Sequence, residues 1–91
     1  MRSRRSYRAM RLNFKLYASL GEYLPAGAER HVVKLEVPES TSPLAILEQH
    51  GVPLAQVHLV LINGVFIPPS ERHLPLSDGD ELAVWPAVAG G

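Results

Sequence analysis

Cysteine is absent from this 91-residue sequence. Its absence excludes disulfide bonds, thiolate metal sites, iron–sulfur clusters and a cysteine nucleophile on this chain. No apolar run approaches the roughly 18 residues that a membrane-spanning helix needs, and no glycine-rich loop matches a phosphate-binding motif. We therefore expect a protein with no membrane partner and no nucleotide site of its own, and we expect it in the cytoplasm.

Metal ligands in a recognisable arrangement are lacking as well. The four histidines are His31, His50, His58 and His73. Their spacings match no familiar metal-site motif. Asp78 and Asp80 flank Gly79, and although paired carboxylates can bind cations, we interpret them as part of a solvated turn. We predict no bound metal ion and no bound cofactor.

The chain has no acidic residue before Glu22. The same stretch is rich in arginine: Arg2, Arg4, Arg5, Arg8 and Arg11. From Leu12 onward, nine acidic residues stand against four basic ones. The net charge of zero therefore combines a basic leader with an acidic body.

Residues 1–10 are interpreted as a disordered leader. Charged and polar residues occupy the positions where an export signal needs an apolar stretch, so the leader is not a secretory signal. A short organellar transit peptide and a nucleic-acid-binding arm stay open as alternatives, although nucleic acid is not the partner that we expect. Met10 is a second candidate for the start of the chain.

Residues 11–85 are predicted to form one domain. Alternating apolar residues predict strands over Arg11–Ala18 and His31–Glu39, joined by a loop with one helical turn. A short helix should follow, with Ser42 as its cap, Pro43 at its first position and Gly51 at its end.

Asn63–Gly64 predicts a two-residue hairpin turn between apolar strands. A turn at Asp78–Gly79 leads to a last strand over Glu81–Trp85, which Pro86 should stop. The order of elements indicates an α+β protein in which one mixed sheet of four to five strands carries one main helix on one face. This is the β-grasp, or ubiquitin-like, roll.

The hairpin is apolar on both of its faces. Pairing of Ile62 with Val65 puts Leu61 and Phe66 on the opposite face. The helix covers one face of the sheet, so apolar residues should gather on the other: Tyr17, Leu61, Phe66 and Trp85. A contiguous exposed apolar patch usually marks a binding surface. Two alternatives stay open: the loop after the first strand covers the patch, or the register is shifted by one residue.

The chain closes on "LSDGDELAVWPAVAGG", with two terminal glycines. Together with the "LYA" ending of the first strand, the short capped helix and "LINGVFI", this sequence resembles the MoaD/ThiS family of ubiquitin-like sulfur carriers over Arg11 to Gly91. Within the family, "WPAVAGG" is most similar to the small subunit of molybdopterin synthase, whose tails tend to read aromatic–Pro–Pro–Val–x–Gly–Gly. Ala87 stands in place of the second proline. Thiazole-synthesis carriers usually lack the proline.

The resemblance implies a sulfur carrier rather than an enzyme. In the family, an E1-like activating enzyme uses ATP to adenylate the terminal carboxylate, here that of Gly91, and a sulfur donor converts it to a thiocarboxylate. The loaded tail, residues 86–91, then enters a partner, most closely the large catalytic subunit of molybdopterin synthase. Gly90 and Gly91 have no side chain to block a narrow channel. Pro86 should stiffen the tail where it leaves the sheet.

The partner-binding residues that we predict are Tyr17, Leu61, Phe66, Trp85, Pro86 and Val88. The acidic body suits a basic groove on the partner. Three alternatives stay open: a sulfur carrier for thiamine thiazole or another thio-metabolite, a ubiquitin-like protein modifier, and a non-covalent binding module.

Overall fold

The computed structural model describes residues 8–87 of the chain. The strands are β1 (Ala9–Leu16), β2 (Val32–Pro38), β3 (Val57–Ile62), β4 (Val65–Phe66) and β5 (Glu81–Pro86). The helices are α1 (Pro43–Gln49) and three short 3-10 helices, η1 (Ala18–Tyr23), η2 (Leu54–Gln56) and η3 (Pro69–Glu71).

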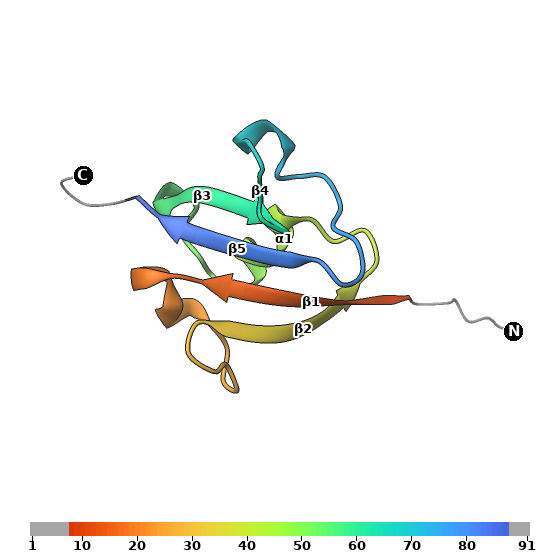
Figure 1. Ribbon diagram of the computed structural model, residues 1–91, viewed down its shortest axis with the longest axis horizontal. Coiled ribbons are helices and arrows are strands. Elements are labelled where there is room, and N and C mark those ends of the chain that lie inside the picture. The colour runs from red at the N-terminus through yellow and green to blue at the C-terminus, as the bar shows by residue number, and fades with distance from the viewer. Residues whose placement is uncertain (1–7, 88–91) are drawn as a thin grey trace, which may run out of the picture.

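The five strands form one mixed sheet in the order β2-β1-β5-β3-β4. β1 and β5 run parallel at its centre, whereas the other neighbours are antiparallel. The main helix, α1, lies behind the sheet in the view of Figure 1. The β-grasp, ubiquitin-like fold predicted from the order of elements is confirmed.

Two strand boundaries differ from the predicted ones. The first strand begins at Ala9 and ends at Leu16, because Met10 pairs with Val37 and is buried. Ala18 has a positive φ of 53°, which ends the extended stretch. The last strand includes Pro86, which pairs with Val57. An irregularity in the pairing lies between Val57 and Leu59, and such bulges are places where a sheet tolerates proline.

The helix α1 has the punctuation that its sequence predicts. The Ser42 hydroxyl accepts a hydrogen bond from the Ala45 amide at 3.1 Å, and Pro43 occupies the first turn. Gly51, with a φ of 71°, follows the helix in the left-handed region that glycine adopts at low cost. With only seven residues, α1 depends on packing for its stability.

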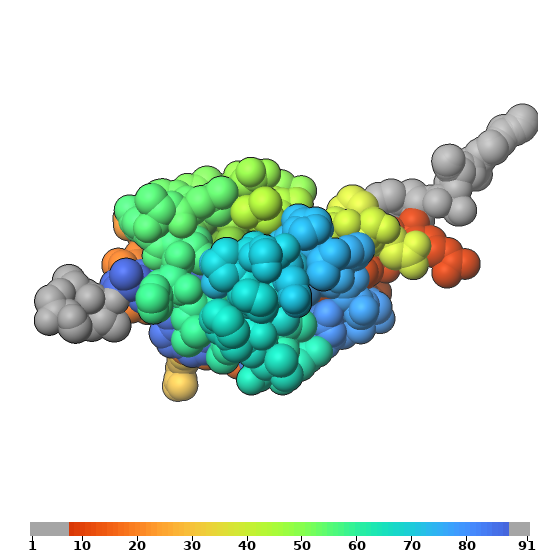
Figure 2. Space-filling model, turned by 90° about the horizontal axis from the view of Figure 1, so that it is seen from above, coloured from red at the N-terminus to blue at the C-terminus, as the bar shows by residue number. Residues whose placement is uncertain are grey.

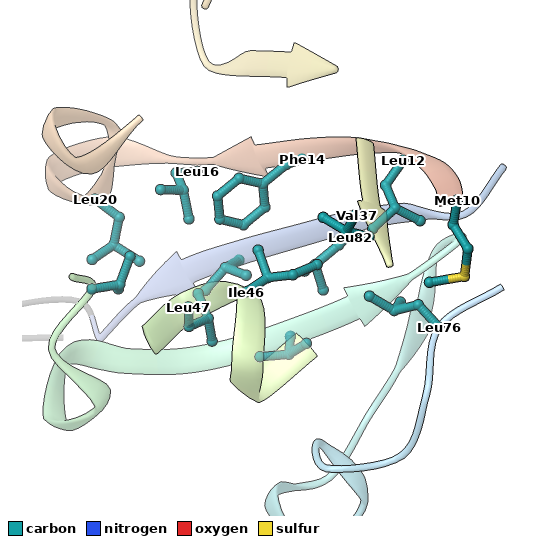
Figure 3. Packing of buried hydrophobic residues seen from close by; sticks show 13 residues of the cluster. Met10, Leu12, Phe14, Leu16, Leu20, Val37, Ile46, Leu47, Leu76 and Leu82 are labelled. Carbon is teal, nitrogen blue, oxygen red and sulfur yellow. The ribbon is translucent and has the colours of Figure 1, made fainter. Parts of the chain in front are cut away.

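The core lies between α1 and the sheet, as Figure 3 shows. Ile46 and Leu47 of α1 are fully buried against Phe14 of β1. Burying one such side chain contributes about 1.5–3 kcal/mol. Leu20 of η1 is also fully buried, so the connection after β1 closes one end of this core. Among residues 8–87, no helix has the length and apolar content to span a membrane.

Candidate functional site

The sheet face opposite α1, called the open face below, carries the apolar residues that the sequence predicts there. Leu82 and Val84 of β5 are fully buried on the helix side, so Ala83 and Trp85, which alternate with them, point to the open face. Cross-strand partners share a face, and the aligned pairs are Leu61 with Ala83, Leu59 with Trp85 and Leu61 with Phe66. The structure therefore brings Leu61, Phe66 and Trp85 together on one face.

The register of this face is set by the β3–β4 hairpin. Ile62 lies opposite Val65, and Leu61 lies opposite Phe66. Asn63 and Gly64 both have positive φ, 52° and 82°, as a two-residue turn of the primed type requires. The predicted register is confirmed, and the alternative of a one-residue shift is wrong.

Trp85 and Tyr17 form an aromatic stack at one end of the open face. Their ring centroids are 4.2 Å apart and their planes are inclined by 2°. The centroid of the His31 ring lies 4.4 Å from the centroid of the Tyr17 ring. The Tyr17 amide also donates a hydrogen bond to the Val84 carbonyl at 3.1 Å. Stacked aromatic pairs contribute about 0.5–1.5 kcal/mol beyond their buried area. The stack therefore fixes the end of β5, where the chain leaves the sheet.

The apolar zone of the open face lies over β3, β4 and β5. Phe66 is 51% exposed, and Leu61 is half-buried. The β1 and β2 side of the same face is polar: Arg11, Asn13, Lys15, Lys34 and Glu36. Lys15 forms an ion pair with Glu81 of β5 at 3.2 Å. An apolar centre with a charged border is the usual composition of a protein interface.

The turn at Asp78–Gly79 is a structural junction at the far end of β5. Asp78 Oδ1 accepts a hydrogen bond from the Arg11 amide at 2.7 Å. Asp80 accepts two, one from Asn63 Nδ2 and one from the Ser77 amide, both at 2.8 Å. The two carboxylates therefore hold β1, the β3–β4 hairpin and the start of β5 together. Residues 8–87 contain no group of three or more His, Cys, Asp or Glu side chains that could hold a metal ion.

Arg72 is a residue that sequence reasoning did not single out. It is 8% exposed, and its guanidinium donates to the Ile67 carbonyl at 3.1 Å and to the His58 carbonyl at 3.2 Å. Burial lowers the pKa of Arg72 from its ordinary value, yet arginine stays charged in proteins. The Arg72 carbonyl accepts from the Leu44 amide of α1 at 3.0 Å. Arg72 thus ties the edge of β3 to the helix.

The remaining predicted site residues belong to the tail. Pro86 ends β5, and Ala87 after it is exposed. Val88, Gly90 and Gly91 lie outside the described residues. Their roles in partner binding and chemistry stay predictions.

Comparison with known proteins places the chain in a family. Residues 9–90 match the family model described as Mut7-C ubiquitin. No curated protein matches the sequence. The solution structure of the Haloferax volcanii HVO 2177 protein is similar in fold, with a TM-score of 0.72 at 21% identity, covering 99% of this chain and 94% of that one.

The crystal structure of SAMP1 from Haloferax volcanii is also similar, with a TM-score of 0.62 at 26% identity. The similarity covers 89% of this chain and 99% of SAMP1. The comparisons confirm a ubiquitin-like β-grasp protein, whereas the sulfur-carrier role and its assignment to molybdopterin synthase stay predictions. The chain is a small ubiquitin-like protein similar to SAMP1, and it belongs to the Mut7-C ubiquitin family.

Proposed function

We propose that this protein is a cytoplasmic sulfur carrier whose reactive group is the C-terminal carboxylate of Gly91. An E1-like enzyme adenylates the carboxylate with ATP, a sulfur donor converts the acyl-adenylate to a thiocarboxylate, and the carrier delivers this sulfur for molybdopterin synthesis. The observation that carries the proposal is the end of β5. The strand leads the chain to Pro86 directly after the Trp85–Tyr17 stack, beside an exposed apolar surface.

The chemistry requires an electrophile on this chain and a catalyst on its partner. The Gly91 carboxylate oxygen attacks the α-phosphorus of ATP, and pyrophosphate leaves. Hydrosulfide supplied by the donor then attacks the acyl carbon, AMP leaves with its electron pair, and loss of the S–H proton gives the thiocarboxylate. An activated acyl intermediate divides one difficult substitution into two easier ones. The chain contributes the acyl group and the tail that carries it to the partner. The partner contributes the nucleotide site and the catalytic bases.

The open face supports docking next to this reactive end. Phe66 is half-exposed, and Leu61 and Trp85 continue the same surface toward the end of β5. Aromatic side chains such as Phe66 and Trp85 are enriched at the centres of protein interfaces. A partner that covers this surface would receive the tail at a fixed starting point, because the aromatic stack holds the strand from which the tail leaves. We propose the large subunit of molybdopterin synthase as this partner.

A ubiquitin-like modifier would begin with the same activation. Its acyl-adenylate would pass to an amine, such as a lysine side chain, instead of a sulfur nucleophile. The shared β-grasp fold and the likeness to SAMP1 are compatible with either acceptor. A carrier for thiamine thiazole or another thio-metabolite, and a non-covalent module, are the remaining alternatives.

Pyrophosphate release tests the activation step. The full chain, incubated with an E1-like activating enzyme of this family and ATP, should release pyrophosphate in proportion to carrier. A variant that lacks Gly91 should give none, and circular dichroism should show that it folds like the full chain. Equal release from both chains, or none from either with an enzyme active on its own carrier, would contradict the proposal. Covalent adducts on other proteins in cell extract would favour the modifier instead.

A further inference from the structure

β2 is an outer strand of the sheet (Figure 1). The backbone amides and carbonyls of alternate residues in β2 therefore point away from β1. The Leu16 amide donates to the His31 carbonyl at 3.0 Å, and the Glu39 amide donates to the Arg8 carbonyl at 2.9 Å. In the antiparallel register, these bonds show that the backbone amides and carbonyls of the odd-numbered residues of β2 point toward β1. The backbone groups of the even-numbered residues therefore point outward: Val32, Lys34, Glu36 and Pro38.

Two of these outward positions are already closed. The Val32 amide and carbonyl both bond to Glu29, at 3.0 and 2.9 Å. Pro38 has no amide hydrogen to offer. Lys34 and Glu36 remain, and within residues 8–87 no backbone group bonds to their outward amides and carbonyls. The edge is thus a short strip of four backbone groups with a stop at each end.

The opposite edge of the sheet is shorter and partly covered, and among residues 8–87 Phe66 is the residue of β4 whose amide and carbonyl point outward. β4 has only two residues, but the Ile67 amide continues its pairing by donating to the Val60 carbonyl at 2.9 Å. Beyond this point the Arg72 guanidinium donates a hydrogen bond to the His58 carbonyl. Figure 2 looks onto this side, where the residues after β4, in cyan and light blue, spread over the middle of the surface. The contrast marks the β2 edge as the place for a further strand.

The sequence of β2 is complementary to itself. When a second copy is laid antiparallel with Leu35 opposite the partner's Leu35, Lys34 meets the partner's Glu36, and Glu36 meets the partner's Lys34. The Lys34 and Glu36 backbones then form hydrogen-bonded pairs, and both side chains lie on the open face. On the core face, Leu35 meets its own copy between two Val33–Val37 contacts.

Neighbouring registers lack this complementarity. A shift that keeps the outward groups in pairs moves the strand by two residues, so Lys34 would meet the partner's Lys34, or Glu36 would meet the partner's Glu36. Like charges directly opposite one another destabilise a strand pair. Within each chain Glu36 also lies opposite Arg11, so in the Leu35 register charges alternate in sign across the junction.

We propose that two copies of this chain form a symmetric dimer through their β2 edges, joining two five-stranded sheets into one. Four backbone hydrogen bonds, two reciprocal Lys34–Glu36 ion pairs and the half-buried Leu35 side chains form the contact. The two-fold arrangement is closed, because both chains contribute the same β2 edge to the contact, and it gives dimers rather than fibres. The inference is independent of the sulfur-carrier proposal, because the apolar zone and the end of β5 lie beyond β1 and stay uncovered.

Charge reversal tests the register directly. Lys34→Glu leaves two acids on the edge, and Glu36→Lys leaves two lysines. Sedimentation velocity of the full chain should show a concentration-dependent dimer, and each variant alone should dimerise at least roughly tenfold more weakly. An equimolar mixture of the two variants should restore the dimer, because each Glu then meets a Lys.

Matched controls separate the edge from overall charge. The double change Gln49→Glu with Gln56→Glu, and the single change Glu48→Lys, make the same changes of net charge at exposed positions of α1 and η2, away from the β2 edge, and each should dimerise like the unchanged chain. Circular dichroism checks that every variant folds, since Glu36→Lys also places a cation opposite Arg11.

Amide hydrogen exchange in the unchanged chain provides a second measurement that needs no variant. The Lys34 and Glu36 amides should exchange at least about tenfold more slowly at concentrations where the dimer forms. A chain that stays monomeric at millimolar concentration overturns the proposal. A dimer whose Lys34 and Glu36 amides stay unprotected, or that both reversals leave intact, also overturns it, because the contact then lies elsewhere.

Discussion

Replacing Asp80 by alanine removes two hydrogen bonds from the junction that precedes β5. The carboxylate accepts from Asn63 Nδ2 and from the Ser77 amide, each at 2.8 Å. One hydrogen bond contributes about 0.5–1.5 kcal/mol net, and the junction is partly exposed, so we expect a loss of about 2 kcal/mol. For a domain of this size that loss lowers the melting temperature by about 10 °C.

The assay is thermal and urea unfolding followed by Trp85 fluorescence. Glu48→Ala is the matched control, because it removes the same charge from an exposed position of α1 and should change stability by less than about 0.5 kcal/mol. Asn63→Gly removes Nδ2, the atom that donates to the Asp80 carboxylate. Glycine adopts the positive φ of this position without strain. A double-mutant cycle of Asp80→Ala with Asn63→Gly should therefore give a coupling of about 1 kcal/mol. A loss no larger than that of Glu48→Ala, or a coupling of zero, would refute the structural role of this turn.

Three further substitutions test other parts of the structure. Phe66→Lys should change the unfolding free energy by less than about 1 kcal/mol, because Phe66 is 51% exposed, while binding to the sulfur-accepting partner measured by calorimetry weakens more than about tenfold; an unfolded variant would mean that Phe66 belongs to the core. Arg72→Met should lower the urea-derived stability by about 1–3 kcal/mol because two carbonyls lose their donor, and Arg72→Lys should not rescue it, since a single ammonium replaces a planar fork; full stability in either variant would contradict this. Gly64→Ala should cost about 1–2 kcal/mol in thermal unfolding, all of it from the backbone, because an added Cβ meets no atom within 4 Å; an unchanged melting temperature would show that the turn relaxes.

Local signals in the sequence were sufficient for most of the fold. The Asn63–Gly64 pair fixed the turn type, and the turn type fixed which residues of the hairpin face the helix. Ser42, Pro43 and Gly51 marked the ends of α1 because capping depends on residues that are neighbours in the chain. The open-face positions of Leu61, Phe66 and Trp85 followed from strand alternation alone.

Long-range contacts were outside the reach of these signals. Asp80 and Asn63 are 17 residues apart, so the sequence around Asp78–Gly79 indicated only a turn. Arg72 has no local pattern that distinguishes a buried guanidinium from a solvated one, and its role appears only when β3 and the segment after β4 are adjacent. The start of the first strand was placed two residues late, because Met10 was assigned to the leader although it pairs with Val37.

Conversion of the Gly91 carboxylate to a thiocarboxylate is the central step of the proposed function, and intact mass spectrometry tests it most directly. The full chain is incubated with ATP, an E1-like activating enzyme of this family and a sulfide source, beside a chain that lacks Gly91. We predict a mass gain equal to the exchange of one oxygen for sulfur in the full chain and no gain in the shortened one. An unchanged mass, with an activating enzyme that loads its own carrier under the same conditions, would contradict the sulfur-carrier role and favour a non-covalent binding module.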